Sequence, residues 1–160
     1  MKNLTLFFLL ALFSCNIKTV SISEDYKLKQ VETINQLLNN WHKAAAEADL
    51  ENYFNKMTDD AIYLGTDASE RWTKDEFLTF CNPYFDKGKA WDFIPYNRQI
   101  YYSKDGKTIW FDELLKTWMG VCRGSGVIRN DNNTFKITHY HLSVTIKNEK
   151  VKEFLQINQN

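Results

Sequence analysis

The chain has 160 residues, of which 44% are hydrophobic and 15% aromatic, and this length suits one domain with a sizeable core and leaves no room for a second. Twenty basic and twenty acidic residues give a formal net charge of zero, so the chain lacks the basic excess of a nucleic-acid-binding protein. Aromatic residues at this density build a core and also line small-molecule pockets.

Residues 1–14 have the pattern of an export signal: Lys2 supplies the positive charge, and the apolar run from Leu4 to Phe13 is too short to span a bilayer. The sequence Leu12-Phe13-Ser14-Cys15 resembles a bacterial lipobox, in which the cysteine becomes the first mature residue and its sulfur takes a diacylglycerol. The resemblance implies lipidation of Cys15 and a lipid-anchored protein of the bacterial cell envelope, facing the periplasm or the cell surface. The alternative is an ordinary secretory signal with an incidental cysteine.

Residues 15–25 are expected to form a polar tether, and residues 26–160 a single domain. Apolar residues recur every three or four positions from Tyr26 to Ala48, which predicts a long amphipathic helix. Asp49 is a candidate N-cap for a short second helix. Asp59 and Asp60 predict a break before a short strand, 61–64.

Thr73 and Glu76 have the spacing of a capping box, which predicts the start of a third helix. Pro83 is expected to kink or shorten the last turn of this helix, and Gly88 to end the helical region. From Ala90 onward the hydrophobic period changes to two, which predicts strands. Turn residues separate these strands at 104–107, 120 and 130–133, so the second half reads as a four-stranded antiparallel meander in an α+β fold.

With this order of elements, the chain resembles the SnoaL-like branch of the nuclear transport factor 2-like superfamily. Three segments carry the resemblance: Trp41-His42, Leu64-Gly65-Thr66-Asp67 and Phe135 to Ser143. The resemblance covers Lys27 to Lys147. It implies a curved antiparallel sheet wrapped around N-terminal helices, forming a cone with an internal pocket. Members of the superfamily include isomerases, dehydratases, epoxide hydrolases and pure binding or assembly domains, so the fold does not settle the function.

His139 and His141 are two of only three histidines, and alternation along a strand places both on one face with Phe135, Ile137 and Ser143. This face is expected to line the pocket. A pair of histidines could hold a metal, but no third-ligand motif accompanies it, and no metal or cofactor is expected. The alternative is that each histidine is hydrogen-bonded within the core.

Only one of the neighbours Asp112 and Glu113 can point inward on a regular strand. The late segment is also similar to the closing strand of the calcium/calmodulin-dependent kinase association domain, where a pocket arginine takes the place of Asp112, and this resemblance favours Asp112. Arg123 lies in a strand with two glycines and could bind a carboxylate or phosphate. The alternatives are an exposed Asp112, an Asp112 paired with Arg123, or a bulge with a solvated Arg123.

Tyr63, Trp72 and Trp110 are further candidate ligand-binding residues, the first two beside the loop that is expected at the pocket mouth. Leu64-Gly65 stands where ketosteroid isomerases of the superfamily present an aspartate base, which argues against that reaction. Cys81 and Cys122 are expected to be buried free thiols, although an exported pair could form a disulfide.

The favoured hypothesis is a lipid-anchored domain that binds a small polar, anionic or polar-aromatic molecule. One alternative is a small hydrolase, dehydratase or isomerase with Asp112 or His139 as general base. Another is an assembly module that forms a homodimer through the outer face of the sheet. The expected partners are thus a small-molecule ligand and the membrane, through the N-terminal lipid, with no nucleic acid.

Overall fold

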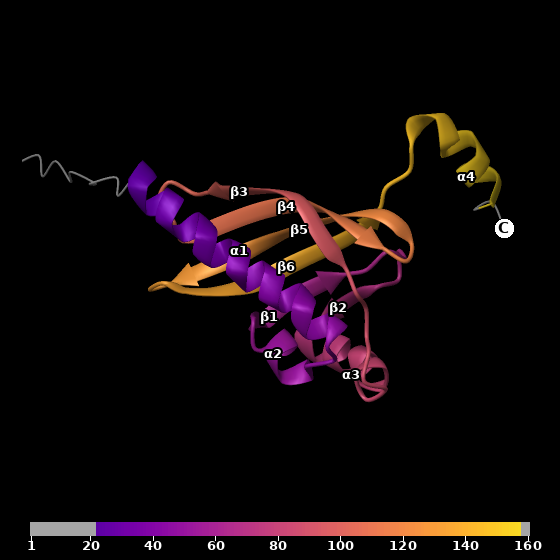
Figure 1. The fold of residues 1–160 in the computed structure, drawn as a ribbon, viewed down its shortest axis with the longest axis horizontal. Helices are drawn as coiled ribbons and strands as arrows, with labels where there is room; N and C mark the ends of the chain where they lie inside the picture. Colours follow the sequence, from indigo (N-terminus) through magenta and orange to yellow (C-terminus); the bar gives the residue numbers. More distant parts are fainter. Residues whose placement is uncertain (1–21, 158–160) are drawn as a thin grey trace, which may run out of the picture.

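The computed structural model describes residues 22–157, and its longest helix, α1 (Glu24–Ala46), begins the domain (Figure 1). Ser23 caps this helix by accepting a hydrogen bond from the backbone N–H of Tyr26 at 3.2 Å. The buried face of α1 consists of Ile34, Leu38, Trp41, His42, Ala44 and Ala45. The predicted amphipathic helix is therefore confirmed, with both ends two residues nearer the N-terminus.

Local capping residues set the starts of the next two helices. Asp49 caps α2 (Leu50–Phe54) by accepting the backbone N–H of Asn52 at 3.0 Å. Thr73 and Glu76 form the predicted capping box at the start of α3 (Lys74–Phe85). This helix continues for two residues past Pro83, so the proline does not end it.

Six strands form one sheet in the order β2-β1-β6-β5-β4-β3. Their bounds are β1 (Met57–Leu64), β2 (Arg71–Thr73), β3 (Ile94–Tyr102), β4 (Thr108–Thr117), β5 (Gly120–Asp131) and β6 (Thr134–Val144). Neighbouring strands are antiparallel except β1 and β6, which pair in parallel. The predicted α+β fold and the antiparallel meander from β3 to β6 are confirmed.

The edge of the sheet near β1 differs from the prediction. Asp59 and Asp60 do not break the chain; they lie exposed within β1, where its pairing with β6 shifts register between Met57 and Ile62. Their carboxylates lie 2.9 Å from Lys74 Nζ and Arg129 Nη2, respectively. The adjacent acids Asp59 and Asp60 led to the prediction of a break because both side chains remain in water along this irregular part of the strand.

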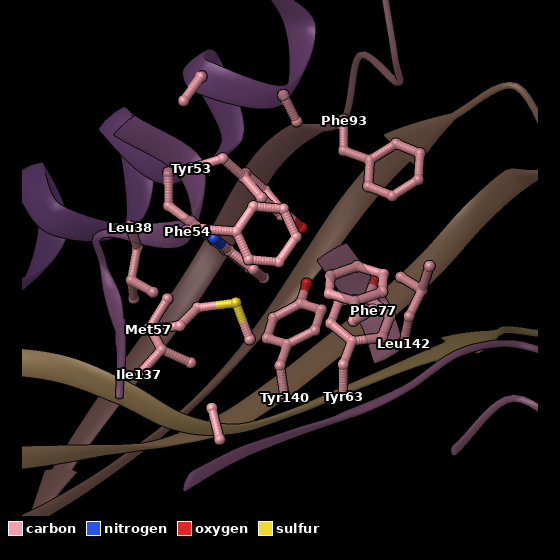
Figure 2. Packing of buried hydrophobic residues seen from close by; sticks show 14 of the residues in the cluster. Leu38, Tyr53, Phe54, Met57, Tyr63, Phe77, Phe93, Ile137, Tyr140 and Leu142 are labelled. Carbon is pink, nitrogen blue, oxygen red and sulfur yellow. The ribbon is translucent and has the colours of Figure 1, made fainter. Parts of the chain in front are cut away.

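Helices α1, α2 and α3 cover one face of the sheet, and the core fills the space between them (Figures 1 and 2). Trp41 stacks on Tyr53 with ring centroids 4.9 Å apart and meets Tyr140 edge-on at 4.7 Å. Figure 2 shows Tyr63, Phe77 and Tyr140 packed together above the sheet. Large aromatic side chains therefore occupy much of the interior that was expected to form a pocket.

The chain ends in a short 3-10 turn, η1 (Asn148–Lys150), and in α4 (Val151–Ile157), which has no buried residue and stands clear of the domain (Figure 1). Within residues 22–157, no helix is both long and apolar enough to cross a bilayer. Cys81 and Cys122 are buried and free, as predicted. The predicted signal segment, Cys15 and most of the tether lie outside the described residues.

Candidate functional site

The outer face of the sheet, which helices α1 to α3 leave uncovered, holds five residues that were predicted to face the internal pocket. They are Trp110, Asp112, Arg123, His139 and His141. The Trp110 residue is 44% exposed and the Arg123 side chain 54% exposed. The predicted inward orientation of these five side chains is therefore wrong.

On β4, the residue that points inward is Glu113, which is fully buried, rather than Asp112. Glu113 shares its face of the strand with the buried Phe111 and Leu115, so the apolar pattern of the strand gives the correct face. The choice of Asp112 followed a family resemblance instead. The Asp112 side chain is 35% exposed, and its carboxylate lies 3.6 Å from Arg123 Nη1 on β5, which is the pairing that the alternative interpretation described.

On β6, a bulge reverses the expected alternation. The register with β5 shifts opposite Ile137 and His139, which leaves Thr138 as an extra residue. One extra residue moves every following side chain to the other face. Ile137 consequently stays buried, but Tyr140 points inward, and His139 and His141 point outward.

The two glycines that follow Arg123 on β5 have a packing role. Gly124 and Gly126 face the interior, where a Cβ on Gly124 would collide with the Tyr140 hydroxyl and one on Gly126 with the Phe111 ring. They make room for core side chains, so a close approach of ligand is not needed to explain them. Arg123, next to Gly124, points to the opposite face.

A buried charged cluster, consisting of His42, Arg98 and Glu113, lies inside the cone. His42 Nε2 is 2.7 Å from Glu113 Oε1, while Arg98 Nε donates to Glu113 Oε2 at 2.7 Å. Arg98 Nη1 also donates to the side-chain oxygens of Asn35 at 3.0 Å and Asn39 at 2.9 Å. The two carboxylate oxygens of Glu113 are thus each held by a different partner.

The protonation of Glu113 follows from these contacts. Burial raises the pKa of the Glu113 carboxyl, but the hydrogen bond from His42 and the charges of His42 and Arg98 outweigh burial and bring the pKa below its ordinary value. Glu113 is therefore an anion at neutral pH. Close by, the hydroxyl of Tyr140 and the indole N–H of Trp41 are buried without a hydrogen-bond partner in the described residues.

An aromatic cleft of about 360 Å³ opens between α3, the β1–β2 loop and the β4–β5 turn. Its lining residues are Tyr63, Gly65, Thr66, Glu70, Trp72, Phe77, Phe80, Tyr84, Ala90, Trp91, Phe93, Trp118, Met119 and Leu142. Tyr63, Phe77, Phe93 and Leu142 appear together in Figure 2. A volume of this size lies at the lower end of the range of about 300–1,000 Å³ that is usual for ligand pockets.

The walls of the cleft are stacked rings. Trp72 stacks on Phe80 with centroids 4.7 Å apart, and Phe80 lies 5.4 Å from Tyr84. Tyr84 in turn contacts Trp91 at 6.4 Å. Phe77 is 1% exposed and forms the floor beneath them. Of the predicted ligand-binding residues, Tyr63 and Trp72 are therefore the two that lie in this cleft.

Glu70 brings the one charged group to the cleft lining, counted over residues 22–157. A tight β1–β2 loop positions it, in which Gly65 N–H donates to the Glu70 carbonyl at 2.8 Å. Glu70 Oε2 also accepts the backbone N–H of Asp67 at 3.1 Å. A Cβ on Gly65 would overlap this carboxylate, so Gly65 allows Glu70 to fold over the loop.

Most of the residues that line the cleft were not predicted as ligand-binding from sequence, among them Glu70, Phe80, Tyr84, Trp91 and Trp118. For Phe80, Tyr84 and Trp91 the available signal was the density of large rings between residues 72 and 93. No group of three or more His, Cys, Asp or Glu side chains in the described range is arranged to hold a metal ion. The cleft can therefore offer aromatic faces, one carboxylate and hydroxyl groups to a ligand.

Comparison with protein-family models matches residues 34–147 to the SnoaL-like domain. No curated protein sequence matches the chain significantly. Among solved structures, an NTF2-like protein of unknown function from Pseudomonas putida KT2440 has a TM-score of 0.63 at 14% identity, covering 77% of this chain and 92% of its own.

Two further structures share the fold. A candidate dehydratase of the NTF2-like family from Streptomyces avermitilis has a TM-score of 0.64 at 12% identity, over 76% of this chain and 99% of its own. A protein assigned as a candidate calcium/calmodulin-dependent protein kinase II association domain, from Xanthomonas campestris, has a TM-score of 0.55 at 14% identity, over 72% and 87%. At these identities the similarity establishes the fold alone.

Proposed function

Since the chain belongs to the SnoaL-like domain family, in which fold does not fix function, we propose from its own geometry that it binds a small organic molecule in the aromatic cleft. One observation carries this proposal: eight of the fourteen lining residues are aromatic. Phe80, Tyr84 and Trp118 remain 37%, 43% and 83% exposed. Large apolar side chains that gather in a concave, water-exposed site are typical of a binding surface.

The cleft does not favour an anionic ligand, which was one of the ligand classes expected from sequence. That expectation depended on Arg123, His139 and His141 facing the cone, and these side chains lie on the outer face of the sheet. A ligand of the cleft would instead lie against indole and phenyl faces. The proposed ligand therefore has a large apolar or aromatic part.

Substitution of Trp118 tests the proposal because this side chain is 83% exposed and contributes little to the core. A ligand present at about one hundred times its dissociation constant should raise the melting temperature of the wild-type protein by about 5–10 °C. Trp118→Ala should keep the melting temperature of the free protein and lose most of this shift. Trp110→Ala, on the outer face, is the matched control and should retain it. A full shift in Trp118→Ala would contradict the proposal.

An enzymatic role is the second candidate, and the buried cluster of His42, Arg98 and Glu113 favours it. A histidine 2.7 Å from an ionised carboxylate is a suitable acid–base pair. Asp112 and His139, the bases expected from sequence, face away from the cleft and could not serve a reaction within it. His42 and Glu113 are 5% and 0% exposed and do not line the cleft, so catalysis would require the interior to open. Binding without turnover is the simpler proposal.

We also propose a homodimer through the outer face of the sheet. Tyr101 and Trp110 stack there with centroids 5.9 Å apart, and each is more than 40% exposed. A second copy could bury this flat aromatic pair in an isologous interface. Sedimentation velocity should give a concentration-dependent dimer that Trp110→Asp converts to a monomer. A monomer at all concentrations would refute this proposal.

Lipid anchoring at Cys15 in the bacterial envelope is likewise proposed, from the lipobox-like sequence. Several acyl chains would hold the protein at a membrane, since each buried methylene contributes about 0.8 kcal/mol. Membrane fractions of cells that express the full chain should contain the protein, and intact-mass measurement should show diacylglycerol on Cys15. Cys15→Ser should release the protein from the membrane; a membrane-bound Cys15→Ser variant would contradict the assignment.

A further inference from the structure

The aromatic cleft combines two features that suit one class of ligand. Its lining includes the rings of Trp72, Tyr84 and Trp91, and Trp118 adds a third indole from the turn between β4 and β5. The π-face of an aromatic ring carries partial negative charge and attracts cations, most strongly in tryptophan. Three indoles around one cleft are therefore a favourable environment for a positively charged group.

The single formal charge in the cleft has the same sign as the ring faces. Glu70 lines the cleft, and no Lys, Arg or His is among its lining residues in the described chain. Burial is the main cause of the raised pKa of the Tyr63 hydroxyl, and nearby Cys81 and Glu70 raise it further. Glu70 is therefore close enough to Tyr63 for its negative charge to act within the cleft. An anionic ligand would meet repulsion here, and a neutral one would leave the carboxylate without a counter-charge among the lining residues.

The protein itself supplies an example of this contact at the rim. Lys87 Nζ lies over the ring of Tyr84, 5.9 Å from its centroid, which is within the distance of about 6 Å at which cation–π attraction operates. Lys87 is not a lining residue. The Tyr84 ring thus already accepts an ammonium group, while no lysine or arginine within residues 22–157 lies over the indoles of Trp72, Trp91 or Trp118.

We propose that the cleft is selective for an organic cation, such as a quaternary ammonium compound, with Glu70 as the counter-charge. This inference rests on the proposed function, because it names the ligand class of the same cleft. A quaternary ammonium group suits the cleft because it has no N–H to hydrogen-bond and gives up its hydration at low cost to apolar ring faces. Gly65 serves selectivity indirectly, by leaving the space that the Glu70 carboxylate occupies.

The test compares choline with 3,3-dimethylbutan-1-ol, a neutral molecule of nearly the same shape in which carbon replaces nitrogen. Titration calorimetry on the full chain should show choline binding roughly tenfold more tightly than the alcohol, the ratio expected from cation–π and carboxylate attraction. Glu70→Gln should weaken choline binding several-fold and leave the affinity for the alcohol unchanged. Asp92→Asn is the matched control, because it removes an exposed carboxylate beside Trp91 that does not line the cleft.

The outcomes separate this inference from the proposed function. Equal or tighter binding of the alcohol, or the same loss of choline affinity in Asp92→Asn as in Glu70→Gln, would overturn cation selectivity and leave small-molecule binding in place. No choline binding at about 10 mM would also overturn it, since the attraction described should give at least millimolar affinity. If a broad library produces no ligand whose effect depends on Trp118, the proposed function itself fails.

Discussion

Replacement of Glu113 by glutamine should destabilise the domain strongly. Glu113 is fully buried, and its carboxylate holds Arg98 and His42, whose side chains are 8% and 5% exposed. The glutamine side chain would keep the shape but leave the guanidinium of Arg98 buried without a counter-charge, a change that costs about 3–5 kcal/mol in other proteins. Because Arg98 would retain its hydrogen bonds to Asn35 and Asn39, we expect a loss near the lower end, about 3 kcal/mol.

Urea denaturation followed by tryptophan fluorescence measures this loss as a change in the free energy of unfolding. Asp112→Asn is the matched control, because Asp112 is the adjacent residue and its ion pair with Arg123 lies on the exposed face. The control should lose less than about 1 kcal/mol. Equal losses in the two variants, or a loss below about 1 kcal/mol in Glu113→Gln, would refute the assignment of Glu113 to the interior.

Three other changes test the same packing and charges. Gly124→Ala should lower the free energy of unfolding by about 1–3 kcal/mol, because its methyl group would displace the buried Tyr140 hydroxyl; an unchanged urea midpoint would contradict this. The lowered pKa of Glu113 means that its contribution to stability is complete above the ordinary value of 4.5 and is lost as pH falls through the lower folded-state value. Melting temperatures should therefore fall below pH 4.5 less steeply in Glu113→Gln than in the wild type, and equal slopes would exclude this linkage. Removal of residues 148–160 should leave the melting temperature unchanged, because η1 and α4 contain no buried residue, and a clear decrease would show that α4 packs on the domain.

The fold was predictable because local signals agree along most of the chain. Asp49 and Thr73 each cap a helix, as their positions predicted, and the period of hydrophobic residues changes from helical to strand-like near Ala90. The early strand was less predictable, since Asp59 and Asp60 lie exposed in an irregular part of β1. A pattern of polar residues cannot distinguish a loop from a strand whose side chains remain in water.

The site was predictable only in part because strand parity depends on long-range pairing. The Thr138 bulge arises where β6 pairs with both β5 and β1, and nothing in the local sequence marks it. This bulge places His139 and His141 on the outer face and Tyr140 in the interior. On β4, by contrast, the apolar residues Phe111 and Leu115 share a face with Glu113 and indicate correctly that Glu113 points inward.

The cleft could not be assembled from sequence because its rings come from distant parts of the chain. Trp72 precedes α3, Trp91 follows it, and Trp118 lies in the turn between β4 and β5. Each was identifiable as a large aromatic residue, but their convergence on one opening depends on how α3 packs beside β1 and β2. Glu70 was similarly obscured, since its place in the cleft depends on the fold of the 65–70 loop.

The most direct test of ligand binding in the cleft is a ¹H–¹⁵N NMR titration that follows the indole N–H signals of all five tryptophans. The titrant is choline, or the library compound with the largest thermal shift. Trp72, Trp91 and Trp118 line the cleft, whereas Trp41 is buried in the core and Trp110 lies on the outer face. We expect the first three signals to move on titration and the last two to stay. Movement of Trp110 without Trp72, Trp91 or Trp118 would contradict binding in the cleft and place the binding surface on the open side of the sheet.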